Sequence, residues 1–367
     1  MNTAPTNTQL QQACIPSFII AGVLDHAEER GLAPEALIAG LGLTVPQIRH
    51  AEILLSFRQA TTIIRRLIRA LPEEPSGLQI GSRGALGSFG ILGLAMLASP
   101  TVGEALAIGL EHHRTAGSLL DFSAGHAPDE ALIRFEERFP DREILPFLCE
   151  EAAASVLALL RLALGPAISL RRIELNYPEP VYAESYRRLF NCPILFNRAS
   201  ACLVMDATLL KAPLPTRSLT SCRAAVSASR QLVGEAATNP DIVASVENLI
   251  YRNCRRRLSM ASIAESLNIT ERTLRRSLAA AGHTFSALRD RTLQRRACDL
   301  LSQSELSISD IAVEIGFSDL REFRRAFQRW TGMNPSQLRR TLSTAPAEED
   351  MQEHSTSANA RTTAETA

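Results

Sequence analysis

Two short segments near the C-terminal end of this 367-residue chain carry closely spaced arginines with apolar residues between them. A guanidinium group can donate two parallel hydrogen bonds to a guanine edge or to a phosphate, so such clusters suit nucleic acids. In a helix, the apolar residues that lie four apart would turn inward and the arginines would face solvent. The pattern therefore predicts two DNA-contacting faces, formed in the first segment by Arg272, Arg275 and Arg276 and in the second by Leu320, Arg321, Arg324 and Arg325.

The two segments belong to a duplicated pattern. The run 258–264 recurs 48 residues later as 306–312, whereas the run 274–278 recurs 49 residues later as 323–327. One residue is therefore added in the second turn, between helices that keep their apolar pattern. A helix, a short turn and an arginine-bearing helix form a helix-turn-helix unit, which places its second helix in the major groove of DNA. The repeat predicts two such units.

Capping residues indicate where the two arginine-bearing helices begin. Thr270 precedes a predicted helix over 271–280, and Asp319 precedes one over 320–331. Both side chains are suitable N-caps. Leu320 is an apolar residue on the second face, where it could contact only a thymine methyl group or a sugar. We therefore expect the two units to share a scaffold and to read different bases.

Charge is distributed unevenly along the chain. The total is balanced, with 39 basic and 39 acidic residues, but Tyr251–Leu342 contains 17 arginines and nine acidic residues, a net charge of +8. The rest of the chain has a net charge of −8. A basic block on an acidic protein is typical of binding to the phosphate backbone. Within this block, 285–301 is predicted as an amphipathic connector helix that fixes the separation of the two units.

The chain is longer than one typical hydrophobic core requires, so we expect two main domains. The prediction is a flexible N-terminus (1–16), an α+β effector-binding or oligomerisation domain (17–215), a linker helix and break (216–238), an all-α DNA-binding domain (239–342) and a disordered tail (343–367). The tail is rich in Thr, Ser, Ala and Glu and has no apolar periodicity. Asn239, which is followed by proline, is expected to cap the first helix of the DNA-binding domain.

Helical and strand patterns alternate within 17–215. Apolar spacing predicts helices over much of 17–71, a helix capped by Thr101 with Glu104, and a long helix over Leu145–Leu164. Alternation of apolar and polar residues predicts strands at 131–136, 172–177, 192–196 and 201–205. The last two are expected to pair around a turn at 197–200. This mixture indicates an α+β fold.

Two further passages could do chemistry. The glycine-rich passage 77–93 could cradle a phosphate, but it lacks the accompanying strand and Lys-Ser/Thr signature, so turns and close helix contacts are favoured. Adjacent Glu111, His112 and His113 could bind a metal or move protons. Neighbours on a helix diverge by about 100°, however, so the two histidines cannot share one ligand set. We therefore predict no catalytic residue, no metal site and no cofactor.

The seven cysteines are dispersed and form no C-x-x-C pair. This indicates reduced thiols in a cytoplasmic protein and argues against a disulfide framework or a zinc site. One alternative is a DNA-alkylation-response or other enzyme fused to the same DNA-binding module, although an alkyl-transfer protein needs clustered zinc-binding cysteines. An architectural DNA binder without an effector is a second alternative, although it would not need a separate acidic domain.

The run 308–339 resembles the signature of the AraC/XylS family of bacterial transcription regulators. Its matching pieces are Gly316-Phe317-Ser318, Arg325-Ala326-Phe327 and Asn334-Pro335-Ser336. The resemblance covers about 240–341 and implies a module of seven helices with two helix-turn-helix units. The base-reading positions of the family match Arg272, Arg275, Arg276, Leu320, Arg321 and Arg325. Asn268 stands where the family usually has a turn glycine, and Asp319 stands where it commonly has a serine. These departures affect the expected local phosphate contacts and leave the expected fold unchanged.

The preceding domain resembles, more distantly, the arabinose-binding-like regulatory domain of one AraC-type branch. The matching pieces are 81–84, 90–93, 99–106 and 190–196. This resemblance implies an effector-binding or oligomerisation role, and it does not imply arabinose as the ligand. The candidate effector-binding residues are Phe89, His112, His113, Phe122 and Phe135.

Together these features predict a ligand-responsive transcription regulator, more often an activator than a repressor in this family. We expect it to bind double-stranded DNA at promoter half-sites as a homodimer, with each protomer reading two successive major grooves about 34 Å apart. The other expected partners are RNA polymerase and an unidentified small molecule. No association with a membrane is expected.

Overall fold

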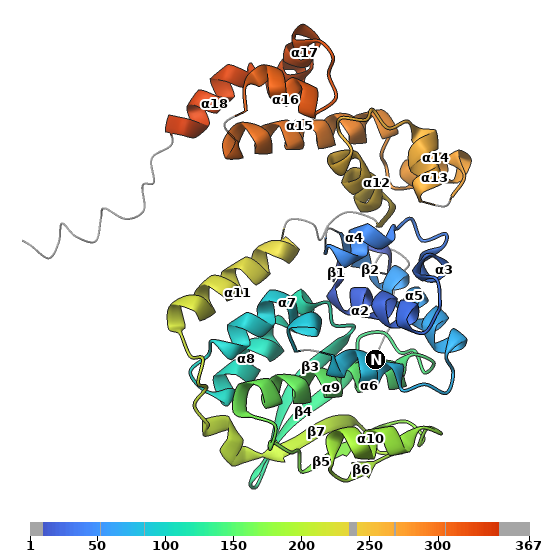
Figure 1. The fold of residues 1–367 in the computed structure, drawn as a ribbon, viewed down its shortest axis with the longest axis vertical. Coiled ribbons are helices and arrows are strands. Elements are labelled where there is room, and N and C mark those ends of the chain that lie inside the picture. The colour runs from blue at the N-terminus through green and yellow to red at the C-terminus, as the bar shows by residue number, and fades with distance from the viewer. Residues whose placement is uncertain are drawn as a thin grey trace, which may run out of the picture. The chain divides into compact units, whose positions relative to one another are not determined.

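A computed structural model describes residues 10–51, 53–83, 85–234, 241–267, 269–304 and 306–344. They form two compact units, and Figure 1 labels their elements. The first unit contains the chain up to Asn248 together with Met260–Gly282, and the second contains Leu249–Ser259 together with the chain from His283. These limits do not coincide with the predicted division at residue 239, so the domain bounds stay a prediction.

The first unit begins with a two-stranded sheet and four helices, β1 (Ala13–Pro16), α2 (Phe18–Glu29), α3 (Pro34–Ile38), α4 (Val45–Arg49), β2 (Leu54–Ser56) and α5 (Phe57–Ala70). β1 pairs antiparallel with β2, and Ala13 and Ile15 are buried. The prediction of a flexible segment through residue 16 is therefore wrong for Ala13–Pro16, because these apolar residues are part of the core. Residues 1–9 lie outside the described part of the chain.

A five-stranded sheet forms the centre of the first unit. Its strands are β3 (Leu120–Ala127), β4 (Glu130–Glu137), β5 (Arg172–Glu174), β6 (Ile194–Leu195) and β7 (Ala201–Asp206), in the spatial order β3-β4-β7-β5-β6. The predicted pairing of 192–196 with 201–205 is wrong. β6 pairs in parallel with β5, and β7 lies between β4 and β5. The helix α10 (Ala183–Phe190) provides the crossover that a parallel pair requires, and this non-local connection has no local sequence signal.

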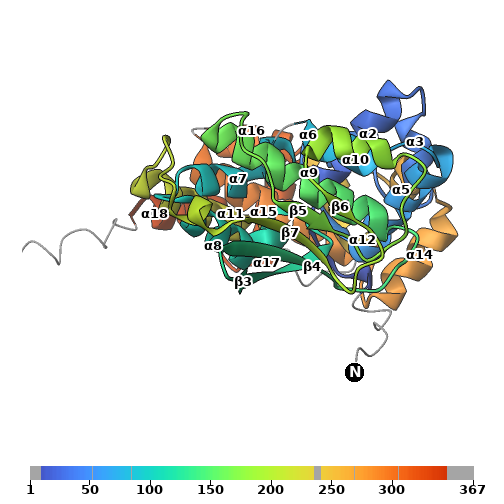
Figure 2. The ribbon, with the colours of Figure 1, turned by 90° about the horizontal axis from the view of Figure 1, so that it is seen from below.

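The first unit contains further helices after α5. They are α6 (Ser76–Ser82), α7 (Ala85–Leu97), α8 (Val102–His112), α9 (Leu145–Leu164), α10 and α11 (Leu219–Gly234), with short 3₁₀ turns η1 (His113–Ala116) and η2 (Ala207–Lys211). The bounds of α9 match the prediction, and Figure 2 shows it lying over one face of the sheet. Thr101 caps α8 as predicted, because its hydroxyl accepts from the Glu104 N–H. The mixed α+β class is confirmed.

The glycine-rich passage brings helices close together, as predicted. α6 packs directly against α9, and a Cβ added to Gly77 would lie 2.6 Å from the Phe147 carbonyl oxygen. A Cβ added to Gly81 would lie 2.8 Å from that of Ala154. In α7, Gly90 has φ 54°, and a Cβ added to it would lie 2.8 Å from the ring of Phe18. Larger residues would separate these helices, so the glycines set the position of α9 over the sheet.

Seven helices follow in the described C-terminal part of the chain, namely α12 (Asp241–Arg252), α13 (Met260–Ser266), α14 (Glu271–Ala280), α15 (Phe285–Gln303), α16 (Ile308–Glu314), α17 (Leu320–Thr331) and α18 (Pro335–Thr344). The all-α class is confirmed, as are the predicted bounds of α14 and α17. The predicted cap Asn239, the turn residue Asn268 and the tail after Thr344 lie outside the described residues. Among the helices described, none is both long and apolar enough to cross a membrane.

Candidate nucleic-acid interface and ligand cavity

The first helix-turn-helix consists of α13 and α14 and is held by a small apolar core. Ile263, Leu274 and Leu278 are buried, with at most 1% of their surface exposed. The Thr270 hydroxyl accepts a hydrogen bond from the Thr273 N–H over 3.1 Å, which begins α14 at Glu271. The opposite side of α14 consists of exposed residues, and these include Arg272, Arg275 and Arg276. The sequence therefore placed these three guanidinium groups on the correct side of the helix.

The arginines of α14 differ in their surroundings. Arg275 forms an ion pair with Glu271 one turn earlier, with 2.7 Å between Nη2 and Oε1. Such an exposed pair contributes little to stability, so the guanidinium can exchange the carboxylate for a phosphate at little cost. Within the described residues, Arg272 and Arg276 have neither a hydrogen-bond nor an ion-pair partner. Their donors are therefore available to an incoming acceptor.

The second helix-turn-helix consists of α16 and α17 and has an aromatic core. Phe323 and Phe327 are fully buried, with their rings 5.6 Å apart in an edge-to-face arrangement. The Asp319 carboxylate caps α17 by accepting from the Arg321 N–H over 2.7 Å. On the outer side, Leu320 is half-buried and the three predicted arginines are exposed, namely Arg321, Arg324 and Arg325.

The turn of this second unit depends on a glycine. Gly316 has φ 85°, a left-handed conformation that side chains rarely adopt. A Cβ at this position would collide with the carbonyl oxygen of Cys254. The backbone of 254 and the turn at 316 therefore lie against each other, and the turn orients α17 relative to α16.

Not all arginines of the basic block face solvent. The guanidinium groups of Arg295 and Arg296 lie 5.0 and 4.9 Å from the ring centroid of Tyr251. The Tyr251 hydroxyl donates a hydrogen bond to Asp299 over 2.7 Å. These contacts join the end of α12 to the connector helix α15 through cation–π and polar interactions. Arg295 and Arg296 therefore stabilise the packing of the end of α12 against α15. The net charge of the sequence does not show this role.

Comparison with protein families identifies both parts of the chain. The model described as the arabinose-binding domain of the AraC transcription regulator matches residues 31–214, and a helix-turn-helix domain model matches residues 263–341. The chain belongs to the AraC family. It is therefore a DNA-binding transcription regulator, and the resemblance seen in its sequence is confirmed.

Some relatives of this AraC-family regulator match it over nearly their whole length. The ornithine utilization regulator of Pseudomonas aeruginosa is 26% identical over 89% of this chain and 96% of its own. An uncharacterized helix-turn-helix regulator of Mycobacterium tuberculosis is 24% identical over the same shares. The crystal structure of the transcriptional regulator CdpR from Pseudomonas aeruginosa is similar with a TM-score of 0.43 and 22% identity, over 88% of this chain and 98% of its own.

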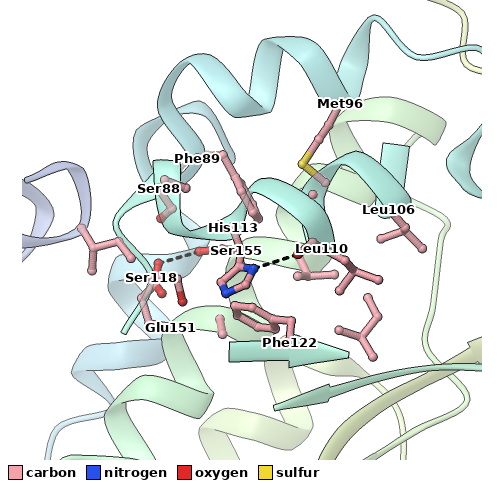
Figure 3. A pocket seen from close by; sticks show the side chains of 16 residues that line it. Ser88, Phe89, Met96, Leu106, Leu110, His113, Ser118, Phe122, Glu151 and Ser155 are labelled. Carbon is pink, nitrogen blue, oxygen red and sulfur yellow. Dashed lines mark hydrogen bonds between the residues drawn. The ribbon is translucent and has the colours of Figure 1, made fainter. Parts of the chain in front are cut away.

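The N-terminal part of the regulator contains a cavity of about 60 Å³. It is partly open and is lined mainly by residues of α7, α8, α9 and the sheet, and Figure 3 shows the side chains that line it. Three of the five predicted effector-binding residues, Phe89, His113 and Phe122, line this cavity. The other two do not. Phe135 packs behind Phe122 with ring centroids 5.5 Å apart, and His112 faces Arg230 over 3.1 Å.

Most of the cavity wall is apolar, and two of its polar side chains, His113 and Ser118, already form hydrogen bonds within the protein. His113 Nδ1 lies 2.8 Å from the Leu110 carbonyl oxygen, and Nε2 lies 3.0 Å from Asp121 Oδ1. Both ring nitrogens are therefore engaged outside the cavity. The Ser118 hydroxyl is likewise engaged with the backbone of Leu120. Neither group therefore has a free N–H or O–H donor with which to orient a ligand.

Glu151 is the acidic residue of the cavity wall, and it was not among the predicted residues. It lies on α9, is 6% exposed, and accepts a hydrogen bond from the Ser155 hydroxyl over 2.8 Å. The Ser88 hydroxyl also bonds to this carboxyl. Burial raises the pKa of Glu151 above its ordinary value, although both hydroxyls lower it. The signal in the sequence was a pair of glutamates, 150 and 151, in the middle of an apolar helix.

The described residues provide no metal centre. No group of three or more His, Cys, Asp or Glu side chains among them is arranged to hold a metal ion. All seven cysteines are free thiols, and burial raises the pKa of several of them, for example that of Cys254 to about 11. A raised pKa disfavours the reactive thiolate. Nothing in this arrangement favours the alternative of an alkyl-transfer enzyme.

Proposed function

We propose that this regulator reads two successive major grooves of promoter DNA with each protomer. α14 enters one groove with Arg272, Arg275 and Arg276, and α17 enters the next with Leu320 and the arginines beside it. The observation that supports this is the exposure of these arginines on the side of each helix opposite its buried core. Each good bidentate contact with a base discriminates by about 1–3 kcal/mol.

The two units are proposed to recognise different base sequences. The face of α14 offers three guanidinium groups, which suit guanine edges and phosphates. The face of α17 begins with half-buried Leu320, which can offer only apolar contact, for example to a thymine methyl group. A binding half-site is therefore asymmetric, and two protomers occupy two such half-sites.

We further propose that a small molecule bound in the cavity beneath α7 and α8 controls DNA binding, and that the regulator acts mainly as an activator. Phe89, His113 and Phe122 contact this effector. The homodimer on DNA presents four recognition helices and contacts RNA polymerase beside the promoter. A cytoplasmic location is part of this proposal, since promoter DNA and RNA polymerase are found there. The support is the apolar cavity in a domain that matches the AraC regulatory domain.

Footprinting on promoters of genes adjacent to its own tests this function. We expect protected stretches centred about one helical turn apart within each half-site. Random DNA at the same salt concentration should give no defined footprint, since non-specific binding has no preferred register. Equal affinity for promoter and random DNA would instead support an architectural binder. A protected stretch of a single turn would contradict the two-groove arrangement.

A further inference from the structure

Among the residues that the structure describes, the buried carboxyl group of Glu151 has no cationic partner. Its hydrogen bonds come from two serine hydroxyls, Ser155 and Ser88, which are neutral donors. A carboxylate has about four acceptor positions, so these two bonds leave part of its capacity unused. Burial without a counter-charge favours the protonated, neutral form of this carboxyl in the empty cavity. A ligand that brought a positive charge would stabilise the ionised carboxylate and pair with it.

The remaining wall of the cavity determines what the rest of such a ligand must be. Around Glu151 the lining consists mainly of apolar side chains, among them Phe89, Leu106, Leu110 and Phe122. None of the 16 residues that line the cavity is lysine or arginine. A ligand carboxylate would therefore find no counter-charge here, and burial of its own charge would be uncompensated.

The size of the cavity restricts the ligand further. An engineered apolar cavity of about 150 Å³ accommodates benzene, and a water molecule needs about 10–15 Å³. The present volume of about 60 Å³ lies between these values. It suits an aliphatic group of a few carbon atoms rather than a sugar or a long chain. A sugar would also leave most of its hydroxyl groups against apolar side chains.

We propose that the cavity binds a small aliphatic primary amine, with its ammonium group paired to Glu151 and its alkyl body against Phe89 and Phe122. This ligand class rests on the effector role proposed above. The ammonium group also donates to the Ser88 or Ser155 oxygen, since it has three donors. An α-amino acid is excluded from the class because its carboxylate would have no partner.

Calorimetric titration of the full-length protein at pH 7 with four probes of one shape tests the proposal. The probes are isopropylamine, isopropanol, isobutyrate and valine, which share an isopropyl body and differ in the polar head. We expect isopropylamine to bind at least about tenfold more tightly than each of the others, a difference of about 1.4 kcal/mol or more. Comparable affinity for isopropanol or isobutyrate, or no binding of the amine, would overturn the proposal.

Glu151→Gln tests the residue itself, and the adjacent Glu150→Gln is the matched control. Glu150 lies on the same helix but accepts from Tyr182 and Tyr186 instead of lining the cavity. We expect Glu151→Gln to remove the preference for isopropylamine over isopropanol, and Glu150→Gln to retain it. Retention of the preference in Glu151→Gln would overturn the assignment. Near-ultraviolet circular dichroism shows whether each variant keeps its packed core.

Failure of the ligand class and failure of the effector function give different results. If isopropylamine binds but leaves the promoter affinity in gel shift unchanged, the ligand class stands and the control of DNA binding is wrong. If a carboxylate or a sugar binds more tightly and changes promoter affinity, the effector function stands and the ammonium–Glu151 pairing is wrong.

Discussion

The Tyr182 hydroxyl donates a hydrogen bond to Oε1 of Glu150 over 2.9 Å, inside the core of the N-terminal domain. Tyr186 donates to the same oxygen, and the N–H groups of Gly77 and Leu78 also donate to this carboxyl. Glu150 is only 2% exposed. Burial raises the pKa of Glu150 to about 7, although these four donors lower it. The folded protein therefore holds this proton more tightly than the unfolded chain does.

This difference makes stability depend on pH in a defined direction. The contribution of Glu150 is fully present below the unfolded pKa of 4.5 and is lost as pH rises through about 7. The loss amounts to about 3 kcal/mol. We expect Glu150→Gln, which does not titrate, to gain that amount relative to the native protein between pH 4.5 and 8. Urea unfolding at several pH values measures the difference, and a difference that does not vary with pH would contradict the assignment.

His26 acts in the opposite direction over an overlapping range. Burial and the nearby charges of Arg83 and Arg30 lower the pKa of His26 to about 4. Its contribution to stability is therefore lost as pH falls from the ordinary value of 6.5 through about 4. Because His26 is present in both proteins, its effect cancels in the comparison of Glu150→Gln with the native chain.

Gly316→Ala should destabilise the protein by about 3 kcal/mol or more, because it combines an unfavourable φ with a collision against Cys254. Gly332→Ala is the matched control. Gly332 also has a positive φ, 75°, but nothing lies within 4 Å of the position that a Cβ would occupy. The control should lose only about 1–2 kcal/mol. Denaturant unfolding measures both, and equal losses would show that the contact with Cys254 does not constrain the turn.

Arg272→Ala and Arg321→Ala should each weaken promoter binding by about 1–3 kcal/mol and relax the preference for one base position. Arg188→Ala removes the same charge from an exposed site on α10, and we expect it to leave promoter affinity nearly unchanged. Gel shifts at one salt concentration, with single-base variants of the operator, measure both effects. Normal binding by both groove variants would show that these arginines do not read bases.

Arg58→Ala should loosen the first turn of α12. Within the first unit, Asp241 accepts from the Arg58 guanidinium over 2.5 Å and from the Ser56 hydroxyl over 3.0 Å, and it is buried. Loss of one donor leaves a buried carboxylate poorly satisfied. We expect backbone amides of residues 243–246 to exchange hydrogen at least about tenfold faster.

Arg69→Ala is the control for this measurement. Arg69 lies on the same helix, α5, and pairs with Glu143 instead of Asp241. We expect it to leave hydrogen exchange in α12 unchanged. Equal acceleration in the two variants would indicate a general loss of stability, and it would contradict a specific link between α5 and α12.

The helix-turn-helix units were predictable because their signals are local. The caps Thr270 and Asp319 and the buried leucines or phenylalanines four apart specify α14 and α17 within ten or twelve residues. For the same reason the exposed positions of the arginines were predicted correctly. The long apolar helix α9 was also predictable from its own periodicity.

Strand pairing and the cavity required the tertiary structure. β6 pairs with β5 instead of with β7, which follows it after a short turn, and β1 is part of the core, because burial of apolar surface is shared among distant segments. The cavity joins Ser88, Phe122 and Glu151, which come from α7, β3 and α9. The sequence by itself determined the helices and the faces that point outward, since helical periodicity acts over a few residues. Only the packing of helices on the sheet decided which side chains enclose the cavity, since that depends on contacts between residues far apart in the chain.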